Sequence, residues 1–524
     1  MTPDHRLFPL RSRRQDGFTL VELLVVILIL GVLAAIVVFS VRGIGDKGRK
    51  NAIAADAATL RTAEESYCAR HGRYGTVDEL RADGLLTGDP VYNMVTVGEE
   101  NKCGRGPSSS FTLYDTSTPT ERTADSIPVG ANPTDLAVDE KADRVYVVSS
   151  GGNTVTVIDG TTDEPIGSPI NVSSAVSSPT RIAVNPGTGQ VYVGGTGGVA
   201  IIDPADAHRV TRVSGFTATV SGLAVSPENG DVYVGGGTGG SSAVAYIAAG
   251  SSSATPIPLP AAALVGTSAG MDFTFDTARH AVYLAKSGHG SGTSAAATSG
   301  LFAISSQTHE ARVVVDFPTK SSCGTPGNNL VINTVRGRTV VDPNRNLVYL
   351  LARRCVPDPG SSTGAWKAVA TTIVVNPVDG SSTAIDDPLG TPYGPLSAVY
   401  NAAAGAVYVY FNGGGTCGGS GGRIDRIVGT KVTGQATVCG MSSAPGNHAR
   451  KIAVLDKYNR IFVAQQKATG PGGLGVADGS TLLTQDPLGT PAQFGALAVN
   501  NTTAKVYAVD LANGTVAVFR TGSD

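Results

Sequence analysis

The sequence has little charge, few aromatic residues and no excess of basic residues. Charged residues make up 16% of the 524 positions, the formal net charge is −2, and Trp366 is the only tryptophan. Nucleic-acid binding requires a basic face, so this balance argues against a nucleic-acid partner. Glycine is abundant instead, with 67 residues, and it separates short Val-rich runs together with Ser and Thr. This pattern indicates a mainly β chain with many turns.

No CxxC motif occurs among the six cysteines, which argues against a zinc ribbon or a thioredoxin-like redox site. The cysteines form three couples that are close in sequence, as is typical of disulfides made outside the cytosol. Proximity suggests the pairs Cys68–Cys103, Cys323–Cys355 and Cys417–Cys439. Sequence alone allows other connectivities as well.

Signatures of common active sites are also missing. No GxSxG, HExxH, Walker or cofactor-binding motif stands in a suitable context. The histidines after residue 200 share no metal-ligand spacing on one element. They are His208, His280, His289, His309 and His448. We therefore expect no catalytic residue, no metal and no cofactor, and we expect that the protein is not an enzyme.

The longest apolar run lies near the N-terminus. Residues 23–41 carry no charge and, with residues 18–21 in front, are long enough to cross a bilayer as a helix. Four arginines precede the run, so the N-terminus should stay in the cytoplasm and the rest of the chain should lie outside. A secretory signal peptide is the alternative, but the run continues to Arg42 without an A-x-A-like cleavage site.

The hexapeptide GFTLVE, residues 17–22, resembles the processing motif of type IV prepilins and type II secretion pseudopilins. The resemblance implies that a prepilin peptidase removes residues 1–17 by cutting after Gly17, and that Phe18 becomes N-methylated. It also assigns Glu22 to assembly, where its carboxylate meets the Phe18 amine of a neighbouring subunit. Two charges that are costly in an apolar medium become tolerable when they are paired. The implied partners are the peptidase, other pilin or pseudopilin subunits and the cytoplasmic membrane.

After the apolar run, residues 49–69 have the pattern of an amphipathic helix. Apolar residues recur there at spacings of three and four, which predicts one buried stripe. The stripe is Ile53, Ala57, Leu60, Ala63 and Tyr67. Residues 67–86 are similar to the small major pilins and the major pseudopilin, in which a turn and a short helix, here 77–82, follow the long helix. We expect a strand pair over 91–97 and 110–114, a pilin-like domain over 18–115 and a linker over 116–124.

The remaining chain, residues 125–524, repeats a strand–turn–strand unit. Periods of about 40–50 residues with several short strands per unit predict a β-propeller. Eight aromatic anchors mark the second strand of each unit: Tyr146, Tyr192, Tyr233, Tyr283, Tyr349, Tyr408, Phe462 and Tyr507. We expect eight blades, or seven if one unit only imitates the repeat, and we expect residues 125–130 to close the ring beside the C-terminus. The repeat resembles the YVTN-type propellers of bacterial and archaeal surface proteins.

The fold class is thus an α+β pilin-like domain followed by an all-β propeller. This combination of domains suggests a minor pilin or pseudopilin that is a single-pass protein of the cytoplasmic (inner) membrane. Such a subunit would join a type IV pilus-like filament at the cell surface and display the propeller for adhesion or recognition. The ligand would be a surface, a glycan or a protein. Two alternatives are a type II secretion pseudopilin that contacts exported substrates, and a membrane-tethered propeller enzyme whose residues converge from several blades.

Overall fold

The structure is a computed structural model of the chain. It describes residues 55–75, 77–87, 93–97, 103, 111–115, 120–238, 241–260, 271–286, 298–318, 323, 332–358, 360–361, 365–387, 395–412, 421–439, 452–464, 472–480, 482 and 484–521. Gly17, Phe18, Glu22 and the expected membrane helix lie outside these residues. Within the described ranges, no helix is both long enough and apolar enough to span a bilayer. The chain divides into two compact units, Met1–Asn93 and Met94–Asp524.

The N-terminal unit contains a helix over residues 55–71 and the short helix α2 (Val77–Ala82). Leu60, Ala63 and Tyr67 of the predicted apolar stripe are buried. The first helix ends at Gly72, whose φ of 70° suits a residue without a Cβ and whose amide donates to the Cys68 carbonyl at 2.8 Å. The predicted short helix over 77–82 is confirmed.

The predicted strand pair is also confirmed. β1 (Asn93–Val97) and β2 (Phe111–Asp115) form a two-stranded sheet.

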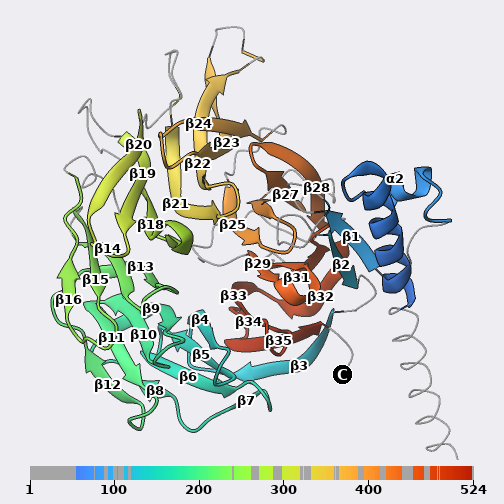
Figure 1. Cartoon of the computed structure of the whole chain (residues 1–524). Coiled ribbons are helices and arrows are strands. Elements are labelled where there is room, and N and C mark those ends of the chain that lie inside the picture. Colours follow the sequence, from blue (N-terminus) through green and yellow to red (C-terminus); the bar gives the residue numbers. More distant parts are fainter. Residues whose placement is uncertain are drawn as a thin grey trace, which may run out of the picture. The chain divides into compact units, whose positions relative to one another are not determined.

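Eight sheets around a central axis form the propeller (Figure 1). Every neighbouring pair of strands is antiparallel. Blade 1 contains β4 (Pro133–Asp139), β5 (Arg144–Ser149), β6 (Thr154–Asp159), β7 (Glu164–Pro165) and β8 (Ile170–Asn171); blade 2 contains β9 (Ser177–Val184), β10 (Val191–Thr196), β11 (Gly198–Asp203) and β12 (Arg209–Arg212). Blade 3 contains β13 (Thr219–Val225), β14 (Val232–Thr238), β15 (Ser241–Ile247) and β16 (Ala254–Pro256); blade 4 contains β17 (Phe273–Asp276), β18 (Ala281–Lys286), β19 (Thr298–Ser305) and β20 (Ala311–Pro318), with the 3-10 helix η2 (Thr277–Arg279) after β17.

The second half of the ring follows the same order. Blade 5 contains β21 (Ile332–Asp342), β22 (Leu347–Pro357), β23 (Trp366–Val375) and β24 (Ser382–Asp386); blade 6 contains β25 (Pro395–Asn401), β26 (Ala406–Asn412), β27 (Gly421–Val428) and β28 (Lys431–Cys439). Blade 7 contains β29 (Ile452–Leu455), η3 (Asp456–Tyr458), β30 (Arg460–Ala464), β31 (Gly472–Asp478) and β32 (Thr484–Ala492); blade 8 contains β33 (Phe494–Asn500), β34 (Lys505–Asp510), β35 (Thr515–Thr521) and β3 (Thr120–Pro128). Eight blades, rather than seven, are therefore present.

The aromatic anchors pack between neighbouring blades. All eight lie on the second strand of their blade and are fully buried. The residue opposite each anchor on the inner strand is small or β-branched, for example Ala137 opposite Tyr146 and Ala498 opposite Tyr507. A small residue there leaves room for the aromatic ring, so large and small side chains alternate within the layer between blades.

The ring closes with a strand from each end of the propeller. β3 pairs with the C-terminal strand β35, with Ile127 opposite Val516, and the predicted closure is confirmed. The strand begins at Thr120, so residues 120–124, which we expected to be linker, belong to blade 8. Without β3 the edge of β35 would be exposed; β3 covers this edge and gives blade 8 its fourth strand.

Candidate functional site

The two faces of the propeller differ in their connections. In each blade, the connection between the first and second strands lies at one face of the propeller. The connection between the third and fourth strands lies at the same face. We call this the turn face. The connections between second and third strands, and between consecutive blades, lie at the opposite face, which we call the insertion face. This assignment follows from the antiparallel order of each sheet.

Short connections held by side-chain hydrogen bonds characterise the turn face. Asp139 Oδ1 accepts bonds from the amides of Lys141 and Ala142, both at 3.1 Å. Such a side-chain turn fixes the backbone locally. The same arrangement recurs at Asp159, Asn185, Asp342 and Asn500.

Side chains of the turn face also join one blade to the next. Asn185 Nδ2 donates to the Gly230 carbonyl at 2.9 Å, and Asn401 Nδ2 donates to Asn459 Oδ1 at 2.6 Å. Comparable contacts link Asn229 to Ser306, Asn344 to Tyr400, Asp456 to Asn501 and Asn500 to Asp143. The turn face is therefore cross-linked around most of the ring, as a rigid support requires.

Two histidines of blade 4 bind carboxylates of blade 3 on the turn face. His280 Nδ1 contacts Glu228 Oε1, and His309 Nε2 lies 3.0 Å from Asp231 Oδ2. The His309 ring also stacks on Tyr246, with ring centroids 3.5 Å apart. Sequence reasoning treated these histidines as scattered. The structure brings His280 and His309 to one seam between blades, each with its own carboxylate.

The insertion face carries the long connections. They occur from blade 3 onward and lie largely outside the described residues. Their ranges are 257–272, 287–297, 319–331, 358–365, 387–394, 413–420, 440–451 and 465–471. Loops of this kind on a rigid scaffold are where binding residues usually occur. The insertion face of blades 4–7 is therefore the candidate recognition surface.

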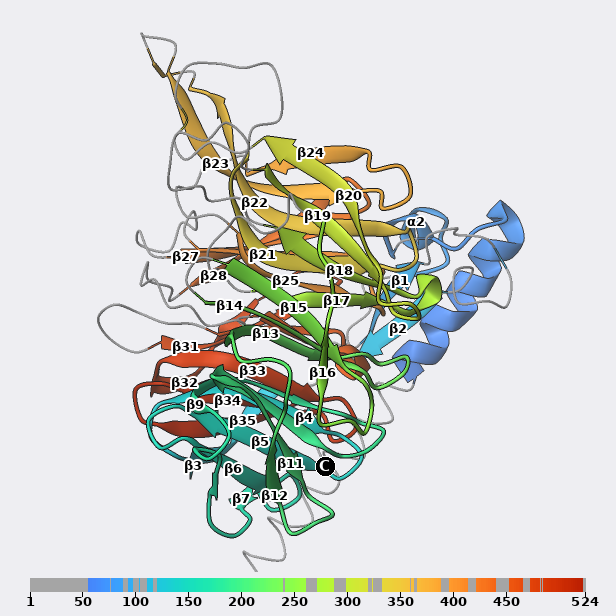
Figure 2. The ribbon, with the colours of Figure 1, turned by 90° about the vertical axis from the view of Figure 1, so that its left-hand side faces the viewer.

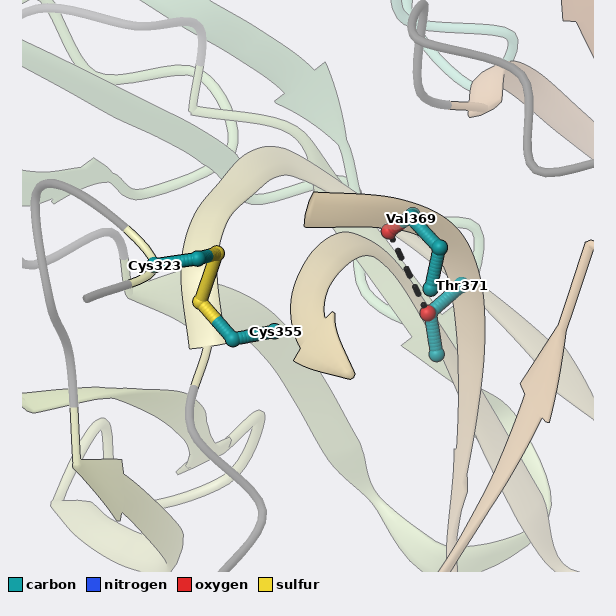
Figure 3. The surroundings of a disulfide bond; sticks show 4 residues. All are labelled: Cys323, Cys355, Val369 and Thr371. Carbon is teal, nitrogen blue, oxygen red and sulfur yellow. Dashed lines mark hydrogen bonds between the residues drawn. A yellow bond between two sulfur atoms is a disulfide. The ribbon is translucent and has the colours of Figure 1, made fainter. Parts of the chain in front are cut away.

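Blade 5 has the longest strands next to this face. β22 and β23 pair as far as Pro357 opposite Trp366, and Figure 2 shows both strands reaching beyond the neighbouring blades. The disulfide Cys323–Cys355 ties the connection that precedes the blade to β22 (Figure 3). In the same view, the Thr371 hydroxyl oxygen lies 3.4 Å from the Val369 carbonyl oxygen.

A charged contact holds the outer side of the blade 5 hairpin. The Arg354 guanidinium binds the Asp386 carboxylate through two nitrogens. Thr371 Oγ1 donates to the same carboxylate at 2.8 Å. With the disulfide, these contacts fix a projecting hairpin that carries the only tryptophan near its tip.

A buried ionic cluster joins blade 5 to blade 6. The Arg423 guanidinium donates to Asp387 Oδ1 at 2.6 Å and to both oxygens of Asp425 at 2.5 and 2.9 Å. Gln435 donates to Asp425 at 3.1 Å, and the guanidinium lies over the Phe411 ring. Burial raises the pKa of the Asp425 carboxyl. Because both carboxylates bind the same buried guanidinium, this cluster is best understood as a structural joint between blades.

The N-terminal unit contains one functional candidate that sequence reasoning missed. Glu64 is fully buried, and its Oε2 accepts a hydrogen bond from the Gly75 amide at 2.9 Å. Its Oε1 has no hydrogen-bond partner among the described residues. Burial raises its pKa to about 7. The only sequence signal was its position beside Ala63 on the apolar stripe.

The cysteines follow the predicted pattern where the structure describes them. The pair Cys323–Cys355 is confirmed. Cys68 and Cys103 are both disulfide-bonded. Cys417 lies outside the described residues, so the pair Cys417–Cys439 stays a prediction. Among the described side chains, no three His, Cys, Asp or Glu residues gather as metal ligands.

A family comparison matches the N-terminal segment. Residues 12–38 match the prokaryotic N-terminal methylation motif. The chain begins with a prepilin-type segment. The matched range includes Gly17, Phe18 and Glu22, although it does not test the role of each residue.

Curated relatives with the same segment are type II secretion system core proteins G. The protein from Aeromonas hydrophila is 39% identical over 96 residues, which is 18% of this chain and 62% of that protein. The protein from Dickeya chrysanthemi is 42% identical over 68 residues, 13% of this chain and 44% of that protein. The protein from Vibrio cholerae is 36% identical over 69 residues, which is 13% of this chain and 47% of that protein. The chain thus spans about half the length of these relatives, and its N-terminal region is similar to pseudopilins.

Two solved structures are similar to this chain at low identity. Kuenenia stuttgartiensis hydrazine synthase matches 78% of this chain and 100% of its own, with a TM-score of 0.44 and 14% identity. The Cps50 (Swd1) β-propeller domain from Myceliophteria thermophila matches 78% of this chain and 100% of its own, with a TM-score of 0.41 and 11% identity. Identities this low transfer no activity to the present chain.

Proposed function

We propose that this protein is a pseudopilin-type filament subunit that carries a β-propeller as a recognition domain. The observation that carries the proposal is the succession, in one chain, of a prepilin-type segment similar to core protein G and a closed eight-bladed propeller. A prepilin peptidase would cut after Gly17, Phe18 would be methylated, and residues 18–41 would hold the subunit in the cytoplasmic membrane before assembly.

Glu22 gives this assembly its physical basis. An unpaired carboxylate in a membrane costs a few kcal/mol, and the new amine of Phe18 carries the matching charge. In the assembled filament, a neighbouring subunit would bring its Phe18 amine to Glu22. The pairing therefore favours the assembled filament over the isolated subunit.

The propeller would act by binding rather than by catalysis. A domain of this length has a radius of gyration of about 21 Å, which is bulky for a filament of tightly packed helices. We therefore propose a minor subunit that presents its insertion face to a ligand outside the membrane. The long connections of blades 4–7 and the projecting hairpin of blade 5 support this choice of face.

Processing is tested by replacing Gly17→Arg in the native host. The expected result is an uncut chain retained in the membrane, while the wild-type chain yields a mature protein that begins with methylated Phe18. Gln15→Arg is the matched control, since it adds the same side chain within the leader and should leave cleavage intact. A mature N-terminus at another residue, or normal processing of Gly17→Arg, would overturn the proposal.

The ligand class has two candidates, and the similarity to core protein G favours the first. In a type II secretion pseudopilus, the propeller would contact exported substrates. In a type IV pilus-like filament, it would bind an external surface, a glycan or a protein. A chain ending at residue 115 separates the two: lost secretion of exported proteins supports the first, and lost surface attachment with normal secretion supports the second.

A further inference from the structure

The strand that closes the ring is also the strand through which the chain enters the propeller. β3 begins at Thr120, opposite Thr521, the last residue of β35. Fourth strands begin at the turn face, so the chain from the N-terminal unit reaches the propeller at the turn face. β3 ends at Pro128 at the insertion face and continues through residues 129–132 to β4 of blade 1.

Backbone pairing and one buried side chain hold β3 in place. Its register with β35 runs from Thr120 opposite Thr521 to Pro128 opposite Thr515, with two irregularities. Ile127 is 2% exposed and packs in a cluster with Val516 and Val518 of β35 and with side chains of blade 1. β3 has no outer neighbour within its own sheet.

A pull on the anchor has a defined direction in this arrangement. The N-terminal tether pulls at the turn face, and a ligand held at the insertion face pulls the opposite way. The strands of each blade run between these faces, so the load lies along β3. Hydrogen bonds between antiparallel strands are perpendicular to the strands. The load therefore shears the whole β3–β35 ladder at once, instead of opening it bond by bond.

We infer that β3 is a shear clamp, through which tension between the filament and a bound ligand passes into the propeller. The inference rests on the proposed function, because only an anchored subunit with a ligand at the opposite face carries such a load. The seam beside β3 spreads this load. Lys505 of β34 binds Asp163 of blade 1 at 2.9 Å, and Asn500 binds Asp143 at 2.8 Å, so blades 8 and 1 are joined independently of β3.

The clamp is tested by force spectroscopy on the purified full chain in detergent. One handle is attached at the N-terminus and the other within the Gly-rich connection 413–420 of the insertion face. The first event in the propeller should release β3. Because a strand is already extended along the load, at about 3.3 Å per residue, this step should lengthen the tether by only roughly 1–2 nm. A double variant, Thr120→Cys with Thr521→Cys, joins the strand end to β35. When oxidised, it should survive at constant force at least ten times longer than when reduced.

Two controls keep the result interpretable. The wild-type chain with and without reductant measures any contribution of the native disulfides. Ile127→Ala, which removes buried contact from β3 without a crosslink, should shorten the lifetime at least fivefold. If the oxidised double variant and Ile127→Ala both keep the wild-type lifetime, or if another blade opens first, the clamp is refuted. Because this measurement needs no filament, its failure is separate from a failure of Gly17 processing.

Discussion

At the scale of single residues, Glu64 is the clearest departure from the hydrophobic pattern of the N-terminal unit. Its carboxyl is fully buried, with one hydrogen bond from the Gly75 amide. Burial raises its pKa from 4.5 to about 7, and the charges of Glu79 and Glu65 act in the same direction. The folded unit therefore binds more protons than the unfolded chain between these two values. The free energy of unfolding of this unit therefore falls as the pH rises from 4.5 to about 7, and it is constant above that range.

Replacing Glu64→Gln should remove this pH dependence. A shift from 4.5 to about 7 corresponds to at most about 3 kcal/mol, so the variant should gain up to that amount over the wild type at pH 8 and almost nothing near pH 4. Amide hydrogen exchange of residues 55–75 in the full chain measures the difference, with both proteins compared at each pH. Arg61→Gln, at an exposed position of the same helix, is the control and should leave the pH dependence unchanged. An equal effect of Glu64→Gln at both pH values would contradict the assignment.

At the scale of elements, the β22–β23 hairpin of blade 5 is longer than its neighbours and needs its own supports. The disulfide Cys323–Cys355 closes a loop with a sequence separation of 32 residues. Arg354, Asp386 and Thr371 hold the outer side of the same hairpin. A projecting two-stranded ribbon is only marginally stable by itself, so these supports decide whether it stays ordered.

The double variant Cys323→Ser with Cys355→Ser should loosen this hairpin. A crosslink over a loop of this length contributes about 3–4 kcal/mol in the chain-entropy model. We expect faster amide exchange in β22 and β23, with little change in blades 1 and 2. Treatment of the wild type with reductant should reproduce the effect, and Thr383→Ala on the exposed side of β24 should not. Unchanged exchange in both strands would show that the hairpin does not depend on the disulfide.

At the scale of the whole molecule, the ring depends on contacts between its first and last blades. Lys505 is 6% exposed, and its ammonium donates to the Gly160 carbonyl at 2.6 Å and to both oxygens of Asp163 at 2.9 Å. With the β3–β35 ladder, this contact joins segments more than 300 residues apart in the sequence. Such long-range contacts make the closure a property of the complete ring.

Lys505→Met should weaken the closure, because it leaves the Asp163 carboxylate without its cation. Breaking a buried pair typically costs 3–5 kcal/mol, and Asp163 is partly exposed, so we expect a loss of about 2–4 kcal/mol. This loss of stability is measured by urea unfolding of the full chain, with circular dichroism as the signal. Lys431→Met at an exposed position is the matched control. A midpoint equal to that of the control would mean that the ammonium contributes nothing to ring closure.

Much of the architecture could be read from local sequence patterns. The anchors from Tyr146 to Tyr507 and their turns identify the blades, since each hairpin is specified by neighbouring residues. The last repeat lacked an outer strand, and residues 125–130 before the first repeat resembled one, which predicted their pairing with the C-terminal strand. The short helix over 77–82 and the pair Cys323–Cys355 were also predictable, because they rest on short separations in sequence.

Other features depend on residues that are distant in sequence. Glu64 has an ordinary helical environment until Gly75 and its neighbours enclose it. Arg423, Asp387 and Asp425 look like separate surface charges until two blades enclose them. The separate roles of the two faces likewise appear only when the strand order places every long connection on one side. The sequence by itself determined the repeat, its eight anchors and the prepilin-type start, because these are local patterns. Only the tertiary structure decided which charges are buried and where tension enters the ring, because both depend on blades meeting in space.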